Sequence, residues 1–167
     1  MRLRGIGAKS TGWLALLAAG FCLVGQAALA AHEWRTYRDS AQHFSGCYPA
    51  DLFTSEDPPQ AGEPENFMAS DGAEASMYVT ADENGESLSA ELLDAEAGEF
   101  SGGGKPVFQM VRRGFYLFVG FADGTVVYEK AILKDGYFET FRLSYPKVLR
   151  RNYDPVAKRM ASCFVAG

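Results

Sequence analysis

The sequence of 167 residues predicts an α+β fold in which a mainly antiparallel sheet of about six strands carries one short helix and a longer C-terminal helix. Two observations predict this class. Residues 106–146 contain four consecutive strand-like segments separated by glycine-containing turns, which is typical of an antiparallel meander. Residues 154–164 instead place apolar side chains at helical spacing. Because 47% of the residues are hydrophobic and 13% are aromatic, we expect one globular core.

Residues 1–30 have the three parts of a secretory signal peptide. Basic residues precede an apolar stretch, and Ala-Leu-Ala at 28–30 is a small-residue cleavage site. The unbroken apolar run is shorter than the roughly twenty residues that a spanning helix needs, so we expect cleavage after Ala30. The sequence therefore predicts a single α+β domain over residues 31–167 that is periplasmic or secreted, with no transmembrane segment after cleavage.

The mature chain is acidic. Cleavage removes three of the 16 basic residues and none of the 21 acidic ones, which leaves a net charge near −8 with neutral histidines. A nucleic-acid partner is not expected, because binding to phosphates needs a basic surface. One basic cluster remains, which consists of Lys147, Arg150, Arg151, Lys158 and Arg159. It is a possible patch for an anionic partner or lipid headgroups, with a solvated helix face as the alternative.

The first half of the mature chain predicts two strands and a helix. Residues 44–48 alternate like a strand, and Pro49 ends it because proline lacks the backbone donor. Residues 54–66 hold three prolines and four acidic residues, which predicts a surface loop. Residues 72–81 alternate again and predict a strand, and residues 87–98 are rich in helix formers.

The second half predicts the meander and the final helix. The four strands are expected at residues 106–112, 115–122, 125–133 and 137–146. The pairs Asp123-Gly124 and Asp135-Gly136 favour the positive φ values of hairpin turns. The nearly continuous aromatics of the second of these strands indicate that both of its faces are covered.

The last helix is predicted to begin at Asp154-Pro155. An acid at the cap followed by proline at the first helical position is a typical helix start. One apolar stripe then follows, formed by Val156, Met160, Cys163 and Phe164.

Cys47 and Cys163 are expected to form a disulfide. Cys22 leaves with the signal peptide, and an oxidising compartment favours closure of the remaining pair if the last helix crosses the first strand. The bridge would close a loop of 116 positions, which chain-entropy reasoning values at roughly 4–5 kcal/mol. The alternative is two buried thiols that act as small hydrophobes. A redox role is disfavoured, because no Cys-x-x-Cys motif is present.

Two motifs flank the meander: "FSGCYPADLF" at residues 44–53 and "LSYPKVLRRNYDPVAKRMASCF" at residues 143–164. In this order they resemble the small exported domains of the Mog1/PsbP-like fold, and the resemblance covers about residues 34–165. The similarity is to bacterial exported proteins of that shape more than to the two named branches. Those branches, a regulator of a nuclear GTPase and a lumenal subunit of the oxygen-evolving complex, are accessory proteins without a catalytic centre. The resemblance implies a Mog1/PsbP-like sandwich and an exported, non-catalytic accessory or binding protein of the cell envelope, whose partner is an unidentified envelope protein or small ligand.

The alternative function is a small periplasmic hydrolase that uses His43 with acidic partners. His43 shares a strand face with Cys47, but a nucleophile also needs an oriented base and an oxyanion hole, and no elbow motif is present. Glu129 and Glu139 lie on adjacent strands and could share a face, although pairing across strands with Lys130 or Arg142 is the simpler interpretation.

No cofactor and no metal are expected. The glycine-rich segment at 98–107 departs from a phosphate loop, because Lys105 is followed by Pro106. Residues 80–87 lack the alternate spacing of a calcium loop, and no set of four histidines or cysteines is available for a zinc site.

Overall fold

The computed structural model describes residues 32–41, 43–55 and 63–167. The predicted signal peptide and the middle of the predicted loop at 54–66 lie outside the described residues. Residues 32–167 form one compact unit.

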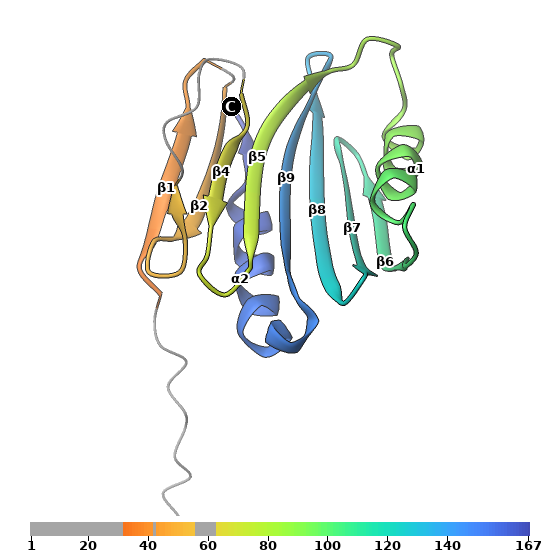
Figure 1. Cartoon of the computed structure of the whole chain (residues 1–167). Coiled ribbons are helices and arrows are strands. Elements are labelled where there is room, and N and C mark those ends of the chain that lie inside the picture. The colour runs from red at the N-terminus through yellow and green to blue at the C-terminus, as the bar shows by residue number, and fades with distance from the viewer. Residues whose placement is uncertain (1–31, 42, 56–62) are drawn as a thin grey trace, which may run out of the picture. The chain divides into compact units, whose positions relative to one another are not determined.

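A large antiparallel sheet is the centre of this unit (Figure 1). Its seven strands follow the order β3-β4-β5-β9-β8-β7-β6. Their bounds are β3 (Thr54–Ser55), β4 (Glu65–Met68), β5 (Glu74–Ala81), β6 (Lys105–Arg112), β7 (Phe115–Ala122), β8 (Thr125–Lys134) and β9 (Tyr137–Pro146). The predicted meander is formed by β6 to β9. Asp123 and Asp135 adopt φ values of 46° and 51° at its turns, in agreement with the Asp-Gly signals.

A second sheet has three strands in the order β1-β2-β10. It consists of β1 (Trp34–Asp39), β2 (Phe44–Pro49) and β10 (Val165–Ala166). The described chain therefore has ten strands rather than about six. The prediction of a loop over 54–66 is wrong at both ends, where β3 and the start of β4 are strands.

Two helices cover opposite faces of the large sheet (Figure 1). The shorter is α1 (Leu88–Glu99), in which Ser87 caps the N-terminus by accepting a 3.2 Å hydrogen bond from the Ala90 amide. The longer is α2 (Arg150–Cys163), which follows the 3₁₀ turn η1 (Lys147–Leu149). Neither helix in the described residues is long and apolar enough to cross a membrane. This architecture confirms the predicted α+β class with its antiparallel sheet and two packed helices.

The predicted start of the last helix is wrong. It begins at Arg150, so Pro155 lies inside α2 rather than at its first position. The Asp154 carboxylate does not cap the helix, because it accepts a 2.8 Å hydrogen bond from the Tyr145 hydroxyl of β9. A tertiary contact thus replaces the expected local one. The predicted stripe is nevertheless buried at Val156, Met160 and Phe164.

The core has two parts, one on each face. On the α2 face, Phe141 and Leu143 of β9 pack against α2 and β2. On the α1 face, Tyr116 and Phe118 of β7 pack under α1. The alternate residues of β7 point to the α2 face, where α2 leaves them only half-buried. The prediction that both faces of this strand are covered is therefore wrong on that face.

Candidate functional site

The uncovered part of the α2 face forms an apolar groove between α2 and strands β6, β7 and β8. Its volume is about 460 Å³, which is within the range of small ligand pockets. The groove is lined mainly by Phe108, Met110, Leu117, Val119, Phe121 and Tyr128. Exposed apolar surface of this kind is typical of protein–protein and ligand-binding sites.

The edge strand β6 makes one wall of the groove. Its register with β7 shifts between Pro106 and Phe108, and this irregularity allows the consecutive residues Val107 and Phe108 both to line the groove. The two side chains are 52% and 50% exposed. Apolar side chains are therefore presented to solvent at an open edge of the sheet.

Basic residues stand along the α2 side of the groove. The Lys147 Nζ lies 4.6 Å from the centroid of the Phe121 ring, and the Arg150 guanidinium lies 5.4 Å from it. Lys158 lines the groove one helical turn beyond Asp154. We call Lys147, Arg150 and Lys158 the basic rim.

Asp154 is the acidic residue among the described residues that line the groove, and its carboxylate is already engaged. Asp154 Oδ2 lies 3.1 Å from the Arg150 Nη2, and Asp154 Oδ1 accepts the hydrogen bond from Tyr145. Burial, and then the bond to Asp154, raise the pKa of the Tyr145 hydroxyl, so it remains a donor. No salt bridge within the described chain holds Lys158. The rim therefore presents net positive charge to the groove.

The five basic residues of the predicted patch do not lie together. Arg159 stacks on the other side of α2, with its guanidinium 4.1 Å from the centroid of the Trp34 ring in β1. Arg151 is exposed and lines no part of the groove. Helical spacing explains this separation, because residues 150, 154 and 158 share one face of α2.

A disulfide between Cys47 and Cys163 holds the helix that carries this rim. It joins β2 to the last residue of α2 with a Cα–Cα distance of 5.9 Å. The link spans 116 positions of sequence. The bond therefore fixes one end of α2 against the small sheet.

His43 lies away from the groove, in the turn before β2, where its φ is 60°. It lines a separate pocket together with Glu139, Lys134 and Asp135. No hydrogen bond within the described residues orients its imidazole, and no serine, threonine or cysteine lines this pocket, so a hydrolytic triad is not assembled from the described residues there. The hydrolase alternative gains no support from this arrangement. Elsewhere, His32 Nδ1 lies 2.8 Å from Asp51 Oδ2, a contact that the sequence did not indicate.

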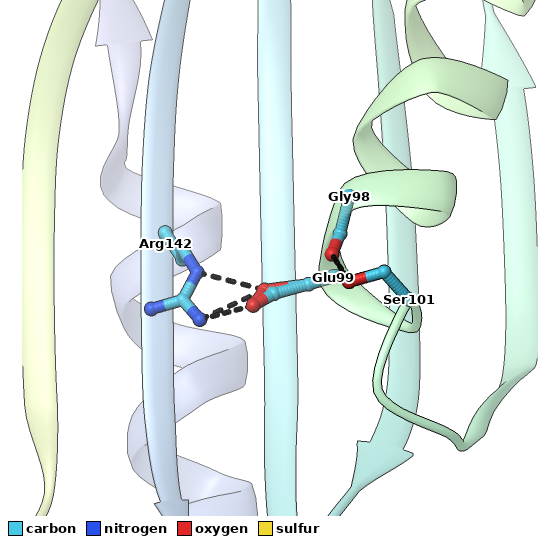
Figure 2. A network of polar contacts seen from close by, with 4 residues as sticks. All are labelled: Gly98, Glu99, Ser101 and Arg142. Atoms are coloured by element: carbon cyan, nitrogen blue, oxygen red, sulfur yellow. Dashed lines mark hydrogen bonds and ion pairs between the residues drawn. The ribbon is translucent and has the colours of Figure 1, made fainter.

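A polar cluster lies on the opposite face of the sheet, under α1. Figure 2 shows Arg142 of β9 pointing at Glu99, the last residue of α1, and the guanidinium donates hydrogen bonds to both carboxylate oxygens. Beside them, the Tyr116 hydroxyl donates a 2.7 Å hydrogen bond to Glu129 Oε1. Burial raises the pKa of Glu129 to about 7, against the opposing effects of Tyr116 and Arg142.

The two meander carboxylates do not share a face. Glu129 is the register partner of Arg142 on the α1 face, whereas Glu139 pairs with Ile132 and lies on the α2 face. Glu129 and Glu139 therefore do not form a paired-carboxylate site. Glu129 instead lies across from Arg142, as the simpler interpretation predicted. Within the described residues, no group of three or more His, Cys, Asp or Glu side chains could hold a metal ion.

No protein-family model and no curated protein sequence matches the chain. Among solved structures, it is similar to the solution structure of cyanobacterial PsbP (CyanoP) from Synechocystis sp. PCC 6803. The TM-score is 0.62 at 14% sequence identity, and the match covers 87% of this chain and 99% of that chain. The chain has the Mog1/PsbP-like fold. The resemblance inferred from the flanking motifs is confirmed at the level of fold.

Proposed function

We propose that the protein is an exported, non-catalytic accessory protein of the cell envelope that binds an acidic segment of a partner protein in the groove. The observation that carries this proposal is the apolar groove between α2 and β6–β8 with its basic rim. Apolar side chains of the partner would fill the groove, and carboxylates would meet the rim.

Charge complementarity favours an acidic segment as the occupant. Lys147 and Arg150 both lie over the Phe121 ring. Within the described chain, the acidic partner of these rim cations is Asp154, which pairs with Arg150. A second copy of the chain is a weaker candidate, because the mature chain carries a net charge near −8 and would repel itself. A partner segment with both apolar and acidic residues would fill the apolar groove and pair with the basic rim.

Two features support export to the periplasm or the medium. Residues 1–30 have the signal-peptide pattern, and the Cys47–Cys163 bond is of a kind that persists in oxidising compartments. Mass spectrometry of the protein from its own cells tests this part. The expected mature N-terminus is Ala31, and a retained N-terminus would contradict export.

Photo-crosslinking in the native cell tests the binding part. A photoreactive phenylalanine analogue replaces Val107, which is exposed in the groove, and in a matched control it replaces Val165, which is 48% exposed in the small sheet. The expected result is one recurrent crosslinked segment at position 107, rich in both acidic and apolar residues, and absent at position 165. Equal crosslinking at both positions, or a basic or wholly polar segment at 107, would contradict the proposal.

A further inference from the structure

A second pocket lies at the other end of the α2 face, where β5, β8 and β9 end near the turn before β2. Its volume is about 570 Å³, which suits a small molecule. Its polar lining is His43, Lys134, Asp135, Tyr137 and Glu139, and Val79 and Ala81 are among its apolar residues. The groove with the basic rim shares none of these residues.

Glu139 is the unusual member of this pocket. Its side chain is 4% exposed, and its Oε2 atom has no hydrogen-bond partner in the described structure. Buried carboxylate oxygens are normally hydrogen-bonded, because an unpaired one loses its hydration without compensation. Because Oε2 is itself shielded from solvent, a donor from outside the protein would supply the missing bond after the Glu139 carboxylate turns toward the pocket.

The surroundings of Glu139 favour an ammonium group as that donor. Tyr137 lies two positions earlier on β9, so its ring shares the face of Glu139, and it is 51% exposed. Across the strand pair, Val79 lies opposite Glu139 and Ala81 lies opposite Tyr137, which gives the pocket a flat apolar floor. An aromatic ring beside a buried carboxylate attracts organic cations.

Lys134 adds a positive charge to the same pocket. It is the register partner of Tyr137 on β8, and its ammonium counteracts the rise that burial causes in the pKa of Glu139. Asp135, in the adjoining turn, reinforces that rise. The pocket is thus lined by both a carboxylate and an ammonium group.

We propose that this pocket binds a small zwitterion whose ammonium group donates to Glu139 and whose anionic group meets Lys134. The proposal does not depend on the partner-binding function of the groove. One ligand would then contact both the unpaired oxygen of Glu139 and the ammonium group of Lys134.

Three probes of equal chain length test it: γ-aminobutyrate, butylamine and butyrate. Each is titrated into the processed, disulfide-bonded protein, and the backbone amide signals of residues 134–139 are followed by NMR. The expected result is saturable shifts with γ-aminobutyrate at lower concentration than with butylamine, and none with butyrate. Glu139→Gln, which keeps the side-chain size, is expected to weaken γ-aminobutyrate binding at least about tenfold.

Two variants separate the interactions. Glu74→Gln removes the same charge at an exposed position of β5 and should leave binding within about twofold of the parent. Lys134→Met should weaken the binding of γ-aminobutyrate but not that of butylamine. Three results would overturn the proposal: none of the probes saturates, butyrate binds as tightly as γ-aminobutyrate, or Glu139→Gln binds as the parent does. Water would then be the partner of the Glu139 oxygen.

Discussion

The Lys130 ammonium of β8 donates a 2.8 Å hydrogen bond to the carbonyl oxygen of Ala161 at the end of α2. A second bond of the same length goes to the carbonyl oxygen of Phe164. The last carbonyls of a helix lack partners within it, and a cation there also complements the negative end of the helix dipole. Lys130 therefore ties the end of α2 to β8, and the disulfide ties the same end to β2.

Replacement of Lys130, which caps the last carbonyl groups of α2, should loosen the end of this helix. Lys130→Met keeps most of the apolar stem but leaves the carbonyls of Ala161 and Phe164 without their donor. We expect a loss of about 1–3 kcal/mol in the free energy of unfolding, measured by urea denaturation. Lys134→Met, which removes a lysine from the same strand without touching α2, is the control. Equal stability of the two variants would contradict a capping role for Lys130.

The disulfide should stabilise the protein mainly by restricting the conformations of the unfolded chain. Its loop of 116 positions sets an upper value of roughly 4–5 kcal/mol in the chain-entropy model. We expect the Cys47→Ser, Cys163→Ser double variant to unfold at clearly lower urea concentration than the parent. The parent measured in reductant should match the double variant. A parent that is equally stable with and without reductant would contradict this role.

Glu129 should make stability depend on pH. Its pKa is about 7 in the folded protein and near 4.5 when unfolded, so the unfolded chain releases this proton first as pH rises. Glu129 therefore costs stability progressively between about pH 4.5 and 7, up to about 3 kcal/mol. Glu129→Gln stays neutral and still accepts the bond from Tyr116.

The stability gain of Glu129→Gln over the parent should thus grow as pH rises through this window and stay constant above it. Denaturant unfolding at a series of pH values measures that difference. Glu74→Gln provides the comparison, because Glu74 is exposed. A gain for Glu129→Gln that does not change with pH would show that its carboxyl is ionised normally in the folded protein.

The contact between Arg142 and Glu99 should hold α1 against the sheet. Arg142→Met leaves the Glu99 carboxylate without its two-point partner in a partly buried site. We expect a loss of about 1–3 kcal/mol in the free energy of unfolding, with faster amide hydrogen exchange confined to α1. Arg35→Met, which removes an exposed pair with Glu33, should change stability by less than about 1 kcal/mol. Uniformly faster exchange across the sheet would argue against a local role for Arg142.

Sequence patterns predicted the parts of this fold that rest on local interactions. The meander follows from strand alternation and from Asp-Gly turns, and the buried stripe of α2 follows from helical spacing. The short strands β1 and β10 were missed, because their pairing with β2 is set by tertiary packing and their residues carry little alternation. The start of α2 was misplaced for a similar reason, since Tyr145 takes the carboxylate that would have capped the helix.

The candidate site was only partly predictable. Basic residues near α2 stand out in an acidic sequence, but which of them reach the groove depends on how far α2 extends over the sheet. Periodicity shows that β7 is apolar on both faces, yet it does not show that one face stays open. The contact of Glu99 with Arg142 joins residues 43 positions apart, and no short-range pattern indicates it.

The proposed function requires the basic rim to recruit an acidic partner segment to the groove. The most direct test is the crosslinking yield at position 107 in cells that carry Lys158→Glu, compared with Arg151→Glu. Both variants reverse one charge on α2, but only Lys158 lines the groove. We expect Lys158→Glu to lower the yield at least about fivefold at unchanged protein level and circular dichroism, while Arg151→Glu keeps it near the parent value. Equal yields in the two variants would contradict recognition through the basic rim.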